Sequence, residues 1–399
     1  MTATVTVIGV DGQNLPPGAG NALAAAGLVV GGRALLRRWV TAPLGTGPSS
    51  PVVDRPRTIE LPTANELSGT TLDALAASVD ADEQAVVLTA GDPAYFGVLR
   101  ALRERSLPTV SWPSVTYVQR AAAMIQRPWD DLTVVSTHGR AFRRAVNVCR
   151  ARPAVGVLSA PGAGPAELGA ALAGWRRTLV VVEAPGDERE ALSIVDPAEA
   201  AARAWREPSV VLCLADLDRT GAAGWVAGGE PVPPADGWAL EEGEFTHREG
   251  MASAPELRAL ALARLAPRPG ALVWDVAAGC GALGVEAARL GAAVVAVEND
   301  PGLCVRIVAN AKRHGVDVRL VDGQVPEALA GLPQPDAVFL GTASGCGRPA
   351  SAAGTWPSTS RTSTPCRLAL ATIRTHSPGS FSTAITAAPS RAASTPSAP

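Results

Sequence analysis

The 399-residue sequence predicts an α/β protein with two domains and a tail of different composition. Short β-rich runs alternate with helical stretches over residues 1–215, and the alternation resumes within residues 244–341. A segment rich in Gly, Pro and acidic residues, 216–243, reads as the linker between them. Strands that alternate with helices indicate largely parallel sheets, and the second stretch has the pattern of half a doubly wound sheet.

The composition excludes several classes of protein. Apolar residues make up 47% of the chain, which is enough for more than one core. Charged residues make up 18% and the net charge is -2, so we expect no nucleic-acid partner. The six cysteines form no CxxC pair, and their spacing predicts no metal site. We recognise neither a secretion signal nor a membrane span, and therefore expect a cytoplasmic protein without a membrane partner.

The first domain is predicted to open with a strand that runs directly into Gly9, and later strands and helices follow in alternation. The strands read from the sequence are Val5–Val10, Ala85–Thr89, Leu132–Ser136 and Thr178–Glu183. The helices read from it are Leu72–Ser78, Leu99–Arg105, Val118–Ile125 and Pro165–Trp175.

The second domain shows the clearest alternation. Its predicted helices are Pro255–Leu265, Leu283–Leu290 and Leu303–His314. Its predicted strands are Ala271–Val276, Ala293–Glu298, Asp317–Val321 and Ala337–Leu340.

The composition changes abruptly after the last of these strands. Residues 342–399 contain 11 Ser and 10 Thr and have no Asp or Glu. A disordered tail is one interpretation. We favour a frameshifted end, because the change falls in the middle of a fold and a GC-rich gene read out of frame would give this mixture.

A glycine-rich loop in the second domain carries a chemical motif. Asp275 ends a predicted strand, Gly279 and Gly281 follow, and a helix begins. Glycine lets the backbone approach a ligand closely, and the start of a helix offers free N–H groups. Glu298 ends the next strand, where a carboxylate can accept hydrogen bonds from ribose hydroxyls, and Asp322 ends a later one.

Two interpretations of this loop remain open. Residues 279–284 match the dinucleotide pattern GxGxxG, with Glu298 about twenty residues further on, as in an NAD-dependent oxidoreductase. The acid before the loop instead resembles the first motif of class I S-adenosylmethionine-dependent methyltransferases, and we favour this family. The first glycine of that motif is Ala277 here, which would crowd the ligand slightly.

The first domain has its own signature. A buried strand ends in the turn Gly91-Asp92-Pro93, followed by aromatic residues and Gly97. Together with residues 7–12, 113–118 and 134–140, this order resembles the tetrapyrrole (corrin/porphyrin) methyltransferases. That family has a two-lobed α/β fold with S-adenosylmethionine in the cleft. The two methyltransferase types in this order resemble those that act on precorrin-6Y in cobalamin biosynthesis.

The resemblance implies an activity and a set of site residues. The first domain would methylate C5 of the precorrin, and the second would methylate C15 and decarboxylate the acetate on C12. His138 is the candidate acid or base, and the arginines of residues 100–105 and 140–144 are candidates to meet the substrate's carboxylates. The residues implied to bind S-adenosylmethionine are Gly9, Thr89, Gly91, Asp92, Pro93, Phe96, Gly97, Ser114, Val115, Thr116, Asp275, Gly279, Gly281, Glu298 and Asp322.

The second domain departs from the family it resembles. A class I methyltransferase sheet has seven strands, and only about four can be read here, so we expect an incomplete domain that is unstable or inactive. Three hypotheses remain open: a methyltransferase damaged in its second half, an oxidoreductase that uses loop 279–284, and a non-catalytic binding protein. The partner is expected to be a tetrapyrrole, and a homo-oligomer is compatible with the sequence.

Overall fold

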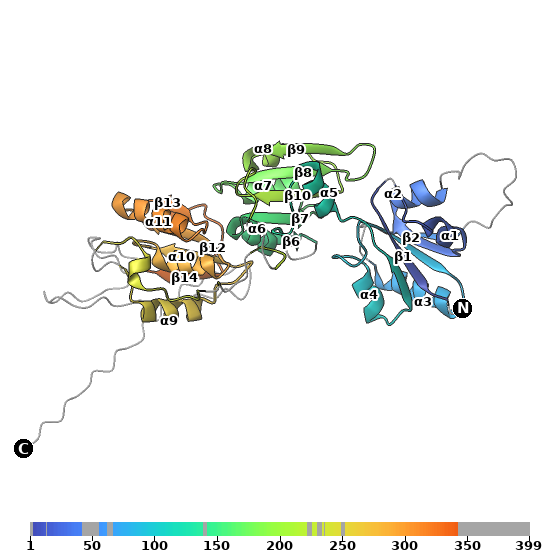
Figure 1. The fold of residues 1–399 in the computed structure, drawn as a ribbon, viewed down its shortest axis with the longest axis horizontal. Helices are drawn as coiled ribbons and strands as arrows, with labels where there is room; N and C mark the ends of the chain where they lie inside the picture. Colours follow the sequence, from blue (N-terminus) through green and yellow to red (C-terminus); the bar gives the residue numbers. More distant parts are fainter. Residues whose placement is uncertain are drawn as a thin grey trace, which may run out of the picture. The chain divides into compact units, whose positions relative to one another are not determined.

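The structure is a computed structural model that describes residues 3–12, 14–41, 56–61, 67–138, 142–221, 226–229, 234, 236–248 and 252–341. The chain divides into two compact units (Figure 1). Unit 1 consists of Met1–Arg140, Ala154–Ala171 and Arg177–Ala223, and unit 2 of Ala141–Pro153, Leu172–Arg176 and Gly224–Pro399. The tail 342–399, to which we assigned a frameshift or disorder, lies outside the described residues.

The first sheet of unit 1 is wholly parallel, with the strand order β3-β2-β4-β1-β5. Every residue of the inner strand β1 is buried, with Val5 and Val7 in one core and Ile8 and Val10 in another. Such alternation is expected of a parallel strand covered on both faces. The elements are β1 (Val5–Val10), α1 (Ala19–Ala24), β2 (Leu28–Gly32), α2 (Arg33–Leu36), a π-helical turn (Arg37–Thr41), β3 (Arg57–Leu61), α3 (Gly69–Asp80), β4 (Ala85–Ala90), α4 (Leu99–Glu104) and β5 (Thr109–Trp112).

The second sheet of unit 1 is mixed, with the order β6-β7-β10-β8-β9. Only its β6–β7 pair is parallel, so the expectation of largely parallel pairing does not hold for this sheet. Its elements are α5 (Tyr117–Met124), β6 (Thr133–Ser136), β7 (Ala154–Leu158), α7 (Pro165–Ala171), β8 (Thr178–Glu183), β9 (Ala191–Val195), α8 (Pro197–Ala202) and β10 (Ser209–Leu214).

Unit 2 contains a parallel four-stranded sheet with the order β13-β12-β11-β14 in the described part of the chain. Beside it lie α9 and α10, and α6 is contributed by the early segment 141–153. The elements are α6 (Phe142–Ala151), a 3-10 turn (Glu242–Glu244), α9 (Pro255–Leu265), β11 (Leu272–Val276), α10 (Ala282–Arg289), β12 (Ala293–Glu298), α11 (Pro301–Arg313), β13 (Arg319–Asp322), a second 3-10 turn (Glu327–Leu329) and β14 (Ala337–Leu340).

Both faces of this sheet are covered. On one face, Val273 and Val294 pack in a core with residues of α9 and α10. On the other, Leu272 packs with Trp175, and Ala151 of α6 lies against the same cluster. A parallel sheet needs cover on both faces, and here residues from within the predicted first domain supply part of it.

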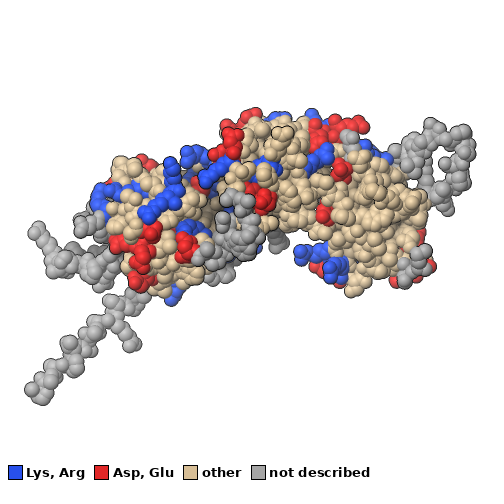
Figure 2. Space-filling model, viewed as in Figure 1, with Lys and Arg blue, Asp and Glu red and all other residues tan. Residues whose placement is uncertain are grey.

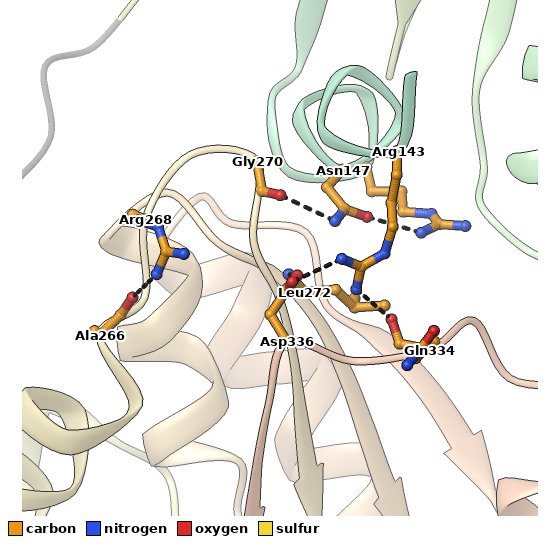
Figure 3. Close-up of polar contacts among 9 residues, drawn as sticks. Arg143, Asn147, Ala266, Arg268, Gly270, Leu272, Gln334 and Asp336 are labelled. Atoms are coloured by element: carbon orange, nitrogen blue, oxygen red, sulfur yellow. Dashed lines mark hydrogen bonds and ion pairs between the residues drawn. The ribbon is translucent and has the colours of Figure 1, made fainter. Parts of the chain in front are cut away.

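An ion pair fixes α6 at the starting edge of the sheet (Figure 3). Arg143 lies 2.7 Å from Asp336 Oδ1 and donates to the carbonyl of Gln334. The other oxygen of Asp336 accepts a hydrogen bond from Leu272 N at 2.8 Å. Arg143, which we considered for substrate carboxylates, is therefore engaged at the edge opposite the strand ends that carry Asp275 and Glu298.

Two further features concern the surface. Figure 2 shows basic and acidic side chains side by side over the face in view, which fits the net charge of -2. None of the helices in the described ranges is long and apolar enough to cross a bilayer.

Candidate functional site

In unit 1, three chain segments converge at the carboxyl ends of β1, β4 and β5. A Cβ at Gly9 would lie 2.5 Å from the carbonyl oxygen of Gly91 and 3.0 Å from Ser114 N, so only glycine fits there. Gly91 N also donates to the Val10 carbonyl at 2.9 Å. The structure thus brings together Gly9, Gly91 and Ser114, as the sequence predicts. Pro93 joins them, with its Cδ 2.9 Å from the same Cβ position.

The turn that follows β4 is closed by local contacts. Asp92 Oδ1 accepts from Ala94 N at 2.8 Å, and a Cβ at Gly97 would lie 2.3 Å from the Pro93 carbonyl. Phe96 has a left-handed backbone, with φ of 53°, and is 54% exposed. The turn therefore exposes Phe96 to solvent, while Asp92 stabilises the turn itself.

The remaining predicted residues of this site differ in accessibility. Thr116 caps α5 through a capping box with Gln119, and Val115 beside it is exposed. Thr89 is fully buried in β4 and its hydroxyl donates to the Ala90 carbonyl at 3.3 Å. The capped start of α5 thus packs beside Gly91. A Cβ at Gly91 would lie 3.5 Å from Thr116 Cα.

His138 lies elsewhere, after β6 of the second sheet. Its Nδ1 is 2.9 Å from Ser136 Oγ, and its backbone N–H donates to the same hydroxyl. Both hydrogen bonds described for His138 are thus local ones. Residues 139 and 140, which belong to the same predicted segment, lie outside the described residues.

Sequence reasoning missed a contact between the two lobes of unit 1. Gly12, just after β1, has a φ of 88°, and a Cβ there would lie 2.0 Å from the carbonyl oxygen of Gly186. Nearby, Arg120 of α5 makes two hydrogen bonds of 2.6 Å with Glu190. The turn after β8 therefore closes on the end of β1. Its glycine was visible in the sequence, but nothing local indicated the partner.

In unit 2, the loop between β11 and α10 has an unusual backbone. Ala277, Gly279 and Gly281 all have positive φ, of 54°, 62° and 76°. Glycine adopts this region freely, whereas alanine does so at a cost of about 1 kcal/mol. The glycines of the predicted motif thus have a conformational reason, and Ala277 stands in a conformation that favours glycine.

Two carboxylates hold the loop. Asp275 Oδ2 accepts from Gly284 N at 2.9 Å, and Glu298 Oε2 accepts from Gly279 N at 2.8 Å. Glu298 Oε1 accepts the backbone N–H groups of residues 299 and 300. The structure therefore brings Asp275, Gly279 and Glu298 together as the sequence predicts. It also shows that both acids shape the loop, in addition to any role with a ligand.

Burial makes the ionisation of Asp275 unusual. Its residue is 1% exposed, and Oδ1 has no hydrogen-bond partner among the described residues. The pKa of Asp275 is raised to about 7, mainly by desolvation; the hydrogen bond from Gly284 N–H lowers it, and the charge of Glu298 contributes to the rise. A buried carboxylate oxygen without a donor is a place where a cationic ligand group would be stabilised.

One further carboxylate and two cysteine thiols lie at the same edge of the sheet. Asp322 is the register partner of Glu298 across β12 and β13, and its side chain is exposed. Burial raises the pKa of the Cys304 thiol, and the charges of Asp322 and Glu298 raise it further. Burial likewise raises the pKa of the Cys280 thiol in the loop. Both thiols thus stay protonated at neutral pH, and neither is an activated nucleophile.

Both candidate sites lie at the carboxyl ends of parallel strands, where open α/β sheets bind their ligands. Each has a close backbone approach set by glycines. In unit 2, the carboxylates of Asp275 and Glu298 also lie beside the loop.

Family comparisons match both parts of the chain. A model described as tetrapyrrole (corrin/porphyrin) methylases matches residues 5–213, and a precorrin methyltransferase domain matches residues 244–372. The second match continues past residue 341, where the composition changes.

Individual proteins resemble the chain to different extents. Precorrin-6Y C(5,15)-methyltransferase [decarboxylating] of Sinorhizobium sp is 33% identical over 264 residues, which are 64% of this chain and 61% of that protein. The probable cobalt-precorrin-6B C(15)-methyltransferase (decarboxylating) of Pyrobaculum calidifontis is 39% identical over 103 residues, 24% of this chain and 53% of that protein. The crystal structure of the C-terminal domain of precorrin-6Y C5,15-methyltransferase from Rhodobacter capsulatus is 37% identical. That match covers 27% of this chain and 59% of that one, with a TM-score of 0.26. The chain thus spans less than two thirds of the length of these relatives.

Proposed function

The chain belongs to the tetrapyrrole (corrin/porphyrin) methylase family, and on this basis we propose that it methylates a precorrin with S-adenosylmethionine. The observation that carries the proposal is the order of two family matches, residues 5–213 and then 244–372. The Sinorhizobium relative bears the name of an enzyme with two methylation positions and a decarboxylation. A chain with two methyltransferase units accounts for two such transfers.

The division of labour follows the two units. Unit 1 transfers a methyl group to C5 of precorrin-6Y. Unit 2 is the counterpart for C15 methylation and for decarboxylation of the acetate on C12. Both reactions belong to cobalamin biosynthesis.

In unit 1, the strand ends that pack closely around Gly9 form the core of the cofactor site. S-adenosylmethionine supplies an activated sulfonium methyl, and the electron-rich macrocycle is the nucleophile. The protein's task is therefore to bind, align and exclude water. Backbone groups around Gly91 and Ser114 would hold the cofactor, and the exposed side chains of Phe96 and Val115 would cover it.

In unit 2, the residues also fit the cofactor. The unpartnered oxygen of Asp275 suits an ammonium group. Glu298 accepts three backbone N–H groups out of about four acceptor positions, which leaves one for a ribose hydroxyl. Exposed Asp322, beside Glu298, would face the base.

We also propose that the second transfer is impaired. The sheet of unit 2 has four strands within residues 252–341, whereas the class I fold has seven. From residue 342 the sequence has no acidic side chain. The family match that extends to residue 372 instead favours an intact domain, so the second transfer itself must be measured.

Calorimetric titration with S-adenosylhomocysteine tests the site in unit 1. Gly9→Ala would place a methyl group 2.5 Å from the Gly91 carbonyl and should remove one binding site per chain. Gly20→Ala is the matched control, because its Cβ would meet nothing within 4 Å. The proposal fails if Gly9→Ala binds S-adenosylhomocysteine like the unsubstituted protein, or if the unsubstituted protein binds NADH in preference to S-adenosylhomocysteine.

A further inference from the structure

Asn310 of α11 is a fully buried side chain that joins two separate segments of unit 2. Its Nδ2 donates to the carbonyl of Cys280 at 2.8 Å and to that of Thr246 at 3.0 Å. Its Oδ1 accepts from Thr246 N at 2.8 Å. Both amide hydrogens are thus used, and removal of the side chain takes this donor away from both carbonyls.

The Cys280 carbonyl lies in the middle of the glycine loop. Gly279 before it is tied to Glu298, and Gly281 after it adopts a φ of 76° at the start of α10. The orientation of this peptide group therefore determines how the loop amides face the ligand side. Ile307, one turn earlier on α11, lies 3.0 Å from the Cβ position of Gly281 and supports the same bend.

The second segment, Glu244–Arg248, runs beside the loop. His314 and Arg313 at the end of α11 contact Glu244, through its carbonyl at 3.0 Å and its carboxylate at 2.8 Å. Phe245 packs in one cluster with Cys280. Residues 313 and 314 of this region hold the segment to the end of α11. Asn310 differs from them because it also donates a hydrogen bond to Cys280 in the loop.

We propose that Asn310 is a positioning residue for the cofactor loop, residues 277–281. We also propose that it couples the ordering of this loop to the ordering of segment 244–248. This rests on the proposed function of unit 2. In this role Asn310 touches neither cofactor nor substrate. Its effect on binding passes through the Cys280 carbonyl and the amides that flank it.

The chain offers a matched control. Asn147 of α6 is also fully buried and also donates to a backbone carbonyl, that of Gly270, at 3.0 Å (Figure 3). Gly270 precedes β11, whereas Cys280 follows it, so the two asparagines act at opposite ends of one strand. A general loss of stability should follow from either substitution, but a change in the loop only from Asn310.

The experiment is hydrogen–deuterium exchange of the full chain with Asn310→Ala, Asn147→Ala and no substitution. Peptides covering residues 277–281 and 244–248 are followed without ligand and during titration with S-adenosylhomocysteine. Without ligand, Asn310→Ala should exchange about tenfold faster in both peptides, and Asn147→Ala should match the unsubstituted protein there. With ligand, Asn310→Ala should need about tenfold more for half-protection.

The outcomes separate the two proposals. Unchanged ligand-free exchange in Asn310→Ala, or equal acceleration by both substitutions, would overturn the positioning role. If S-adenosylhomocysteine fails to protect the loop of the unsubstituted protein from exchange, the function proposed for unit 2 fails. The comparison without ligand then decides alone whether Asn310 positions the loop. If Asn310→Ala does not fold, Asn310→Asp keeps the volume and the acceptor for Thr246 N, and the same criteria apply to it.

Discussion

At the scale of single residues, Asp275 is a carboxyl group almost completely buried from water. Its pKa of about 7 lies above the ordinary value of 3.8, so the folded unit binds a proton more tightly than the unfolded chain. The stabilisation from this proton is complete below pH 3.8 and is lost as the pH rises through about 7.

This linkage gives the first prediction. The free energy of unfolding of unit 2 should contain a component that falls between pH 3.8 and about 7, and Asp275→Asn should remove that component. Denaturant titrations across this range, followed by exchange of peptides from β11, would measure it. An identical pH slope in the variant would show that the carboxyl is not buried as described.

Ala277 gives the second prediction, because it holds a left-handed backbone at a position where the motif expects glycine. Ala277→Gly should raise the stability of unit 2 by up to about 1 kcal/mol and tighten the binding of S-adenosylhomocysteine. Ala266→Gly is the control, since Ala266 has a φ of 50° at the end of α9. If both substitutions change the binding of S-adenosylhomocysteine equally, crowding of the ligand by the Ala277 side chain is not the cause of the tighter binding.

Residue spacing predicted some of the site and missed the rest. Asp275 and Glu298 were found because a strand, a glycine loop and a second strand place them in a recognisable order. Asn310 was missed, because an asparagine within a helical run looks like part of the polar face. Its partners lie 30 and 64 residues away, and no local pattern records them.

At the scale of elements, buried parallel strands were the most predictable. The predicted bounds of β1, β12 and β14 coincide with the structure, since a run of apolar residues between turns marks a strand covered on both faces. The antiparallel pairing of the second sheet was not anticipated. The assignment of α6 to unit 2 was not either, because Arg143 meets an acid 193 residues away.

The contact between α6 and the sheet gives the third prediction. Arg143 is half-exposed, so Arg143→Ala should cost less than about 1 kcal/mol. Asp336 also accepts the Leu272 N–H, so Asp336→Ala should cost more, about 1–3 kcal/mol. Equilibrium unfolding of the two variants compares them directly. Equal losses would mean that the ion pair, and not the backbone contact, is what Asp336 provides.

At the scale of the whole molecule, the chain carries two glycine-lined sites on two different sheets. The strand ends that form them are separate in sequence and belong to different units. A substitution in one site should therefore leave the other able to bind. Gly9→Ala and Asp275→Ala should each remove one site, and the double variant both.

The number of methyl groups transferred to precorrin-6Y tests the proposed function of the two units. The full chain would be incubated with isotopically labelled S-adenosylmethionine, and the product mass and release of carbon dioxide would be measured. We predict one added methyl group and no decarboxylation, with the transfer abolished by Gly9→Ala. Two methyl groups with decarboxylation would contradict the impairment of unit 2, and no transfer would contradict the proposed function itself.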